Sequence, residues 1–263
     1  MGAPAVAAEI RRRAAHRSLA VFLDYDGTLC PIVDDPDEAR ITDTMRQAVR
    51  RLSMTAPVAV VSGRDREDVA RRVGLPELCY AGSHGFDIRC PAQGQVHPAA
   101  DEAVPALDAA EARLRQRLSA LPGVRFERKR FSFAVHYRQV PAPWDAEVRR
   151  AAVEEARASA ALKVQTGKQV YDLVPDVDWD KGRAVRWILA ALGLDRDDTA
   201  PLYLGDDDTD VSAFRAVEAR GVSVGVGDGP AAHRAQLWLA SHDEVERLLF
   251  LLAERPPAGT TAA

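Results

Sequence analysis

The chain has 263 residues, of which 47% are hydrophobic and 28% charged, and its formal net charge is −4. A chain of this length can bury a hydrophobic core in one large domain or two modest ones. The negative charge excludes a general attraction to nucleic acid or anionic membranes, and no run approaches the about 18 apolar residues of a membrane span. We therefore expect a soluble globular protein with neither nucleic acid nor membrane as a partner. The oligomeric state stays open, and a monomer is compatible with this composition.

The first 18 residues are predicted to be an N-terminal extension. Their arginines follow a short Ala-rich run, which is the reverse of a secretory signal. The three cysteines, Cys30, Cys79 and Cys90, are odd in number and lack CxxC spacing. These features are typical of a cytoplasmic protein, and we expect all three cysteines to be reduced thiols, neither disulfide partners nor zinc ligands.

Apolar strands alternate with amphipathic helices after this extension and again near the end of the chain. Three apolar runs end in polar turns that contain glycine and lead toward helical patterns: 19–24 (LAVFLD), 57–64 (PVAVVSGR) and 201–210 (PLYLGDDDTD). Two more runs, 221–227 and 236–240, precede a last helix. This order predicts an α/β fold with a Rossmann-like parallel sheet covered on both faces. Ligands of such sheets bind beyond the carboxyl ends of the strands.

The middle of the chain has a different pattern. In 130–138 (RFSFAVHYR), aromatic and aliphatic residues fall on one strand face and polar residues on the other, and helical patterns lie between such strands. We predict an inserted α+β cap domain here. The predicted domains are the cap at 91–175, a discontinuous core at 19–90 and 176–255, and a flexible tail at 256–263.

Carboxylates stand at the ends of two of the predicted parallel strands. Asp24 and Asp26 follow the first strand in the sequence DYDGT, and four more aspartates follow the strand at 201–204 in the sequence GDDDTD. Close carboxylates repel each other and stay ionised most easily beside a cation. Oxygen ligands of this kind suit a hard divalent cation, and we expect Mg²⁺.

A metal held by several carboxylates attracts a phosphate as a further ligand. Ser62 with Gly63, and Lys181 at a helix start, would hold the phosphoryl oxygens, together with backbone N–H groups at the helix N-terminus. Taken singly, DxD is more often a turn or helix cap, and GDDDTD could be a calcium loop or a solvated acidic turn. Together the motifs occur in the order strand–DxDGT, strand–SG, Lys–helix, strand–GDDxxD, which favours the functional interpretation.

This combination resembles the haloacid dehalogenase superfamily of phosphohydrolases from about residue 19 onward. More finely, YAGSHGFDI, FSFAVHYR and VDWDKGRAV are similar to segments of trehalose-6-phosphate phosphatases, which carry an inserted α/β cap. DxDGT belongs to the superfamily, whereas SHGFDI with VDWDKG is more specific to the family. The resemblance implies Mg-dependent hydrolysis of a small sugar phosphate, trehalose 6-phosphate, to trehalose and phosphate in trehalose biosynthesis.

The resemblance also implies roles for individual residues. Asp24 would attack phosphorus and form an aspartyl-phosphate, and Asp26 would protonate the leaving sugar oxygen and then deprotonate the attacking water. The groups that would bind and stabilise the transferring phosphoryl group are Thr28, Ser62, Gly63 and Lys181. Mg²⁺ would be held by Asp24, the Asp26 carbonyl and Asp206, with Asp207 and Asp210 in support.

The cap is expected to read the sugar. Lys168 and Asp172 lie four residues apart on one strand face, about 13 Å at roughly 3.3 Å per residue, which is the span of a disaccharide. The family usually reads Gly-Lys-x-x-x-Glu-x-Arg-Pro, whereas this chain has Asp172 for Glu and Val174 for Arg. A related substrate, such as a pseudo-disaccharide phosphate with an aminocyclitol ring, is therefore an alternative. The remaining predicted substrate contacts are Arg64, Lys129, His136 and Arg138.

Several alternatives stay open. The basic and aromatic run 125–131 (RFERKRF) is similar to a nucleic-acid patch, but the overall acidity and the strand alternation favour a cap strand, whose inward-facing residues the sequence does not identify. His84 suits a site residue and a structural imidazole in a Gly-flanked turn equally well. A sugar-phosphate sensor without hydrolysis and a phosphotransferase are the alternative functions, and the complete set of site residues argues against the sensor.

Overall fold

The structure is a computed structural model, and it describes residues 2–33, 36–167 and 169–254. The chain divides into two compact units, Met1–Gly94 with Trp179–Ala263 and Gln95–Asp178. We call the first the core unit and the second the inserted unit. The insertion was predicted at 91–175, so the observed boundaries lie a few residues further along the chain at both ends.

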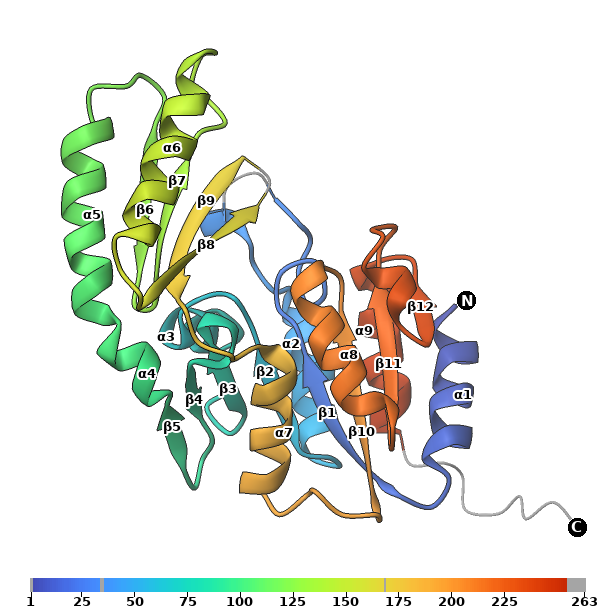
Figure 1. Cartoon of the computed structure of the whole chain (residues 1–263). Helices are drawn as coiled ribbons and strands as arrows, with labels where there is room; N and C mark the ends of the chain where they lie inside the picture. The colour runs from blue at the N-terminus through green and yellow to red at the C-terminus, as the bar shows by residue number, and fades with distance from the viewer. Residues whose placement is uncertain (1, 34–35, 168, 255–263) are drawn as a thin grey trace, which may run out of the picture. The chain divides into compact units, whose positions relative to one another are not determined.

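An eight-stranded sheet forms the centre of the core unit, in the order β12-β11-β10-β1-β2-β3-β4-β5 (Figure 1). The neighbours from β12 to β3 pair in parallel, and β4 runs antiparallel to β3. The strands are β1 (Ser18–Leu23), β2 (Val58–Val61), β3 (Cys79–Gly82), β4 (Asp87–Arg89), β5 (Gly94–Val96), β10 (Thr199–Gly205), β11 (Val222–Val226) and β12 (Leu237–Leu239).

Helices cover both faces of this sheet, because the strands carry apolar side chains on both faces. One apolar cluster joins one face of the sheet to α1 (Ala3–Ala14), α2 (Asp43–Ser53), α3 (Arg66–Val73) and α9 (His242–Ala253). The other joins the opposite face to α7 (Lys181–Ala191) and α8 (Val211–Glu218). The predicted Rossmann-like α/β core is confirmed, with an antiparallel strand, β4, added to its parallel part.

The predicted N-terminal extension is integrated into the core unit. Residues 3–14 form α1, whose Val6 and Ile10 are fully buried in the same apolar cluster as α9. At the start of α1, the amide of Ala3 donates to Glu244 Oε2 of α9. A period of apolar residues within the Ala-rich run supplies this buried face, and the adjacent arginines lie on the exposed side.

The prediction of three reduced cysteines is wrong for two of them. Cys79 on β3 and Cys90 just after β4 form a disulfide, and Cys30 is a buried free thiol. Tyr80 pairs with Arg89 in the antiparallel β3–β4 ladder. The register therefore places Cys79, one residue before Tyr80, opposite Cys90, one residue after Arg89. The cytoplasmic prediction rested partly on reduced thiols and loses that support.

The inserted unit is an antiparallel four-stranded sheet with helices on one face, seen in green to yellow in Figure 1. Its strands are β6 (Arg125–Lys129), β7 (Ser132–His136), β8 (Leu162–Gly167) and β9 (Val170–Pro175), in the order β6-β7-β9-β8. Its helices are α4 (Pro98–Glu102), α5 (Val104–Leu118) and α6 (Trp144–Arg157). The buried side chains of α5 and α6 pack on Phe133, Val135 and Leu173, which leaves the alternate, polar positions on the opposite face.

Both predicted layers, the helix-covered core sheet and the inserted α+β sheet, are therefore present. In the described part of the chain no helix is both long and apolar enough to cross a membrane.

Candidate active site

The DYDGT motif leaves β1 at the middle of the core sheet, between the parallel neighbours β2 and β10. Asp24 directly follows β1, is buried, and its amide donates to the carbonyl of Leu204. The chain then turns back on itself, with the amide of Gly27 donating to the carbonyl of Cys30. A buried strand thus delivers the first carboxylate to the carboxyl edge of the sheet, as the sequence predicts.

Lys181 is the charged group that stabilises Asp24 in this buried position. Its Nζ lies 2.8 Å from Asp24 Oδ1 and 2.8 Å from Asp210 Oδ1, and the side chain is 3% exposed. Asp180 caps the start of α7 by accepting the amide of Arg183 at 2.8 Å, which holds Lys181 at the first helical position. Residues from three distant segments of the chain therefore meet in one buried ion-pair cluster.

Asp210 is saturated by internal hydrogen bonds. Besides Lys181, its Oδ1 accepts the hydroxyl of Tyr203 at 2.6 Å, and its Oδ2 accepts the amides of Asp206 and Asp207 at 3.0 and 3.1 Å. The backbone of Gly205 approaches so closely that an added Cβ would lie 2.3 Å from Asp210 Cγ. Asp210 therefore shapes the turn after β10 and orients Lys181, which fits a supporting position better than that of a direct metal ligand.

The neighbouring aspartates have different surroundings. Asp207 accepts the amide and hydroxyl of Thr209 at 2.9 and 2.6 Å, which caps the short helical turn Asp208–Asp210. Asp206 Oδ1 is buried and has no hydrogen-bond partner among the residues that the structure describes. The Asp206 carboxylate lies against Gly27, where an added Cβ would come within 2.1 Å of Oδ2. Asp206 thus presents an unsatisfied anionic oxygen beside the DYDGT turn.

Three of these carboxylates, from Asp24, Asp206 and Asp210, have oxygen atoms within 4.8 Å of one another. Burial, together with the neighbouring Asp210 and Asp207, raises the pKa of Asp206 to about 7 against the opposing effect of Lys181. Burial also raises the pKa of Asp24 well above its usual range, despite the nearby Lys181. A group of this kind can hold a metal ion, because a bound cation would reverse both effects and satisfy the unpartnered oxygen.

The predicted phosphate-binding residues lie on two turns at the same sheet edge. Thr28, in the DYDGT turn, is fully buried, and its hydroxyl has no partner within the described ranges. Ser62 follows β2, is buried, and its Oγ accepts the amide of Arg64 at 3.1 Å. Gly63 lies between these two residues. The core fold thus brings the motifs of strands β1, β2 and β10 together with the start of α7.

His84 is a site-adjacent residue that sequence reasoning left undecided. Both Ser83 and His84 have positive φ angles, 50° and 57°, and such conformations cost about 1–3 kcal/mol each. The amide of Ser83 donates to the carbonyl of Arg64, and that of His84 donates to the carbonyl of Ser62. The imidazole of His84 packs against Gly63 so closely that an added Cβ there would lie 2.7 Å from Cε1. Gly82 and Gly85, on either side of Ser83 and His84, are the sequence signal for this strained turn.

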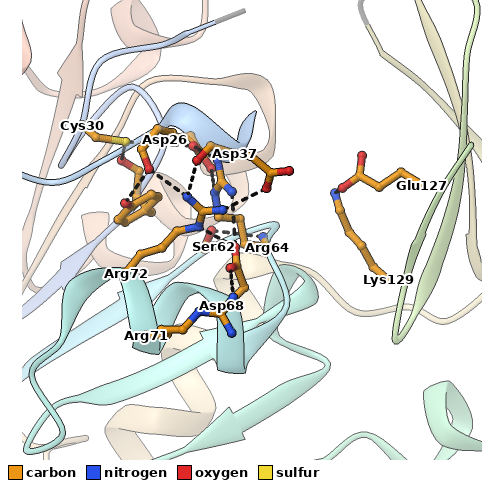
Figure 2. A network of polar contacts seen from close by, with 12 residues as sticks. Asp26, Cys30, Asp37, Ser62, Arg64, Asp68, Arg71, Arg72, Glu127 and Lys129 are labelled. Atoms are coloured by element: carbon orange, nitrogen blue, oxygen red, sulfur yellow. Dashed lines mark hydrogen bonds and ion pairs between the residues drawn. The ribbon is translucent and has the colours of Figure 1, made fainter. Parts of the chain in front are cut away.

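The second carboxylate of the motif, Asp26, turns toward Arg64 (Figure 2). It is not a member of the group formed by Asp24, Asp206 and Asp210. Arg64 was predicted to contact the substrate, and in the structure its guanidinium binds Asp26 and Asp68 of the core unit. The prediction of a substrate contact for Arg64 stays a prediction.

In the inserted unit, strand register places a row of polar residues across the face opposite α5 and α6. Glu127 faces Ala134 across β6 and β7, Ala134 faces Asp172 on β9, and Asp172 faces Gln165 on β8. The predicted contacts Lys129 and His136 lie on this same face, which we call the polar face. Arg128 and Arg130, by contrast, bind Asp108 and Asp101 of the helical layer.

Electrostatics of the polar face centre on two carboxylates. Burial raises the pKa of Asp172, and Lys129 and a hydrogen bond from Ser132 oppose that rise only in part. Asp172 Oδ1 is buried without a hydrogen-bond partner in the described chain. His136 Nε2 lies 3.0 Å from Glu127 Oε2, and this contact, with Lys129, lowers the pKa of Glu127 to about 2 against the effect of burial.

Two other predicted contacts have different outcomes. Arg138 Nε donates to Gln169 Oε1 at 3.1 Å, at the β7–β9 end of the inserted unit. Lys168 lies outside the described residues. Of the contacts predicted in the inserted unit, the structure thus places Lys129, His136 and Asp172 on the polar face.

Comparison with known proteins gives consistent matches. The trehalose-phosphatase family model matches residues 22–237. A trehalose-phosphate phosphatase of Mycobacterium marinum is 45% identical over 242 residues, which is 90% of this chain and 62% of that protein. This chain thus spans less than two thirds of the length of that curated relative.

Solved structures agree with this match. A crystal structure described as a trehalose-6-phosphate phosphatase related protein has a TM-score of 0.77 at 26% identity, covering 90% of this chain and 97% of that one. A haloacid dehalogenase-like hydrolase from Bacteroides thetaiotaomicron has a TM-score of 0.63 at 16% identity, over 89% of this chain and 98% of its own, and shows the shared fold alone.

Proposed function

This chain belongs to the trehalose-phosphatase family, and from this premise we propose that it hydrolyses trehalose 6-phosphate to trehalose and inorganic phosphate, as a step of trehalose biosynthesis. The observation that carries the proposal is the buried contact of Lys181 with Asp24, at the sheet edge where Asp206 presents an unsatisfied oxygen. A buried carboxylate that is oriented by a lysine through one of its oxygens can attack a phosphate ester as a nucleophile.

In the first half of the reaction, a carboxylate oxygen of Asp24 attacks phosphorus and forms an aspartyl-phosphate. The bond between phosphorus and the sugar oxygen breaks, and Asp26, which enters this step in its protonated form, donates its proton to that oxygen. Lys181, with the hydroxyls of Thr28 and Ser62, stabilises the negative charge of the transferring phosphoryl group.

In the second half, Asp26 accepts a proton from water, and the water oxygen attacks the aspartyl-phosphate. Inorganic phosphate leaves and Asp24 returns to its starting state. The same carboxyl group thus acts as an acid and then as a base, which balances protons over the whole cycle. The contact of Lys181 with Asp24 fixes the direction of attack in both halves.

A metal ion fits the carboxylate group in charge and in donor type. Asp24, the Asp26 carbonyl and Asp206 would hold Mg²⁺, with Asp207 and Asp210 in support, and the ion supplies charge neutralisation for the phosphate when bound. The four internal hydrogen bonds of Asp210 support its place behind the direct ligands. Among the described residues, Lys181 is the cation that contacts Asp24 and Asp210.

The polar face of the inserted unit is proposed as the surface that recognises the sugar. Hydroxyl groups of a disaccharide need both donors and acceptors, and Lys129, His136, Glu127 and Asp172 offer both. Asp172 Oδ1, which has no hydrogen-bond partner among the described residues, is the acceptor that most needs a donor, because a buried polar atom without one costs about 1–3 kcal/mol.

A second candidate substrate rests on Val174. Val174 is buried on the polar face and pairs with Lys163 of β8, at the position where the family pattern has arginine. The loss of a guanidinium donor, together with the shorter carboxylate of Asp172, favours a related sugar phosphate, such as a pseudo-disaccharide phosphate with an aminocyclitol ring.

The test is a phosphate-release assay with and without Mg²⁺. The substrates are trehalose 6-phosphate, sucrose 6-phosphate, glucose 6-phosphate and a pseudo-disaccharide phosphate. We expect Mg²⁺-dependent release with the highest kcat/KM on trehalose 6-phosphate. Higher kcat/KM on the pseudo-disaccharide ester would select the second candidate, and binding without release would indicate a sensor.

The variant Asp24→Asn is expected to abolish turnover while leaving the fold intact, because its side chain lacks the nucleophilic carboxylate. Asp43→Asn is a matched control, since Asp43 is exposed on α2 and pairs with Arg46. Wild-type-like phosphate release by Asp24→Asn would exclude the proposed mechanism.

A further inference from the structure

Asp26 is held by a two-pronged contact with Arg64. Arg64 Nε donates to Asp26 Oδ2 and Nη2 donates to Oδ1, each at 2.7 Å (Figure 2). The Asp26 side chain is 43% exposed, whereas that of Arg64 is 11% exposed. A bidentate pair of this geometry fixes the plane of the carboxylate as well as its position. The partly exposed carboxylate of Asp26 is therefore held by the largely buried guanidinium of Arg64.

Arg64 is itself fixed from several sides. Its Nη1 donates to Asp68 Oδ2 at 3.3 Å, and its guanidinium carbon lies 5.4 Å from the centre of the Tyr25 ring. Its amide donates to Ser62 Oγ, and its carbonyl accepts the amide of Ser83 at 2.7 Å. An arginine with both its backbone and its head group fixed cannot follow a ligand far from this place.

Asp68 completes the support from α3. Arg72 Nε and Arg71 Nη2 donate to its two oxygens at 2.7 and 2.6 Å, and Arg72 also donates to the carbonyl of Ala39 at 3.0 Å. Burial raises the pKa of Asp68, but Arg72 and Arg64 outweigh burial and lower it overall. A lowered pKa favours the ionised form of Asp68, which holds Arg64 through the contact drawn in Figure 2.

We propose that Arg64 is a positioning residue that holds the Asp26 carboxyl group in place for proton transfer to the leaving oxygen. This inference rests on the proposed function, in which Asp26 is the acid of the first half-reaction. The Nε and Nη2 groups of Arg64 both bind and orient Asp26, and its Nη1 group binds Asp68. It therefore acts through Asp26 and does not itself need to touch the substrate.

The role has a consequence that depends on the leaving group. A sugar alkoxide leaves poorly without a proton, whereas p-nitrophenolate leaves well unprotonated. General acid catalysis contributes about 10²–10⁴-fold, so the loss of its positioning affects the sugar ester far more than the aryl ester. The ratio kcat/KM reports events up to the first irreversible step, so it isolates the first half-reaction from the shared hydrolysis of the aspartyl-phosphate.

The experiment compares Arg64→Met with wild type on trehalose 6-phosphate and on p-nitrophenyl phosphate. We expect kcat/KM to fall about 100-fold on the sugar ester but only about tenfold on the aryl ester. Arg64→Lys keeps one donor group and should restore part of the lost activity on the sugar ester. Arg247→Met, which removes an exposed arginine of α9 paired with Glu244, is the control for a general effect of this substitution.

Equal losses of kcat/KM on the two esters, or no loss, would overturn the proposal, because Arg64 would then serve the phosphate, the fold or neither. If Arg64→Met does not fold, Asp68→Asn replaces it, since this variant weakens the support of Arg64 and should shift the ratio of the two esters in the same direction. Failure of wild type to release phosphate from every sugar ester would instead contradict the proposed function.

Discussion

The core unit and the inserted unit each present a cluster of charged side chains, and the two clusters differ in burial. Lys181, Asp24 and Asp210 are almost fully buried, and Lys181 Nζ lies 2.8 Å from an oxygen of each carboxylate. Glu127, Lys129 and His136 on the polar face are about one-third exposed. Buried charges interact strongly and keep one geometry, whereas exposed pairs are screened and adjust. The first cluster thus suits chemistry, and the second suits recognition of hydroxyl groups.

The largest expected effect comes from removing the buried cation. Lys181→Met leaves Asp24 and Asp210 without their shared partner, so we expect loss of activity and a fall of about 3–5 kcal/mol in the free energy of unfolding. Urea denaturation in the absence of added metal measures the second quantity.

Lys163→Met makes the same change in the inserted unit, where Lys163 pairs with Asp176 at 3.5 Å on a more exposed surface. Its effect on stability should stay within about 1 kcal/mol. Similar losses in the two variants would contradict the contrast between the clusters.

The second-largest expected effect, a loss of activity, comes from the close packing of the Gly27 backbone against Asp206. Gly27→Ala introduces a Cβ that would lie 2.1 Å from Asp206 Oδ2, at a residue with φ of +80°. Displacement of Asp206 should reduce kcat/KM for phosphate release by about 100-fold. Gly193→Ala is the matched control, because Gly193 also has a positive φ, +66°, but nothing lies within 4 Å of its added Cβ. A comparable loss of activity in the control would attribute the effect to backbone strain alone.

A smaller effect is expected on the polar face. Asp172→Asn removes the charge of an acceptor oxygen that has no partner in the described chain, so KM for trehalose 6-phosphate should rise about tenfold with kcat little changed. Steady-state kinetics with glucose 6-phosphate, which lacks the second ring, provides the comparison. An equal rise of KM for glucose 6-phosphate would place Asp172 outside recognition of the second ring.

The smallest effect concerns pH and Glu127. Its folded-state pKa is about 2, below the ordinary value of 4.5, so its contacts stabilise the fold fully above pH 4.5 and are lost as the pH falls toward 2. Because the side chain is 39% exposed, Glu127→Gln should lower stability by about 1 kcal/mol or less at pH 7. Urea denaturation between pH 3 and pH 7 should show the difference from wild type shrinking as the pH falls. A difference that grows toward low pH would have the wrong sign.

Much of the fold could be predicted from local patterns. The apolar runs that end in DYDGT, SGR and GDDDTD became β1, β2 and β10, because a strand buried on both faces needs a continuous apolar run. The alternation in 130–138 likewise marked β7, with one face buried and one polar. Such signals depend on neighbours in sequence and are therefore visible without a structure.

Other features depend on partners that are distant in sequence. The Cys79–Cys90 disulfide follows from the register of β3 with β4, and the place of α1 follows from its packing beside α9. The strained turn at His84 is stabilised by contacts with the backbone of Arg64 and Ser62. A linear pattern marks the apolar face of α1, but it does not identify the distant partner in any of these contacts.

The sequence by itself determined the order of the motifs, the two kinds of sheet and the residue types at the candidate site, since hydrophobic period and strand ends are local properties. Only the tertiary structure decided which charged residues meet. It paired Arg64 with Asp26 across 38 positions of the chain, turned Glu127 and Lys129 to the polar face, and paired Arg128 with the helical layer. The physical reason is that packing and register, which join distant segments, choose the partner of each charge.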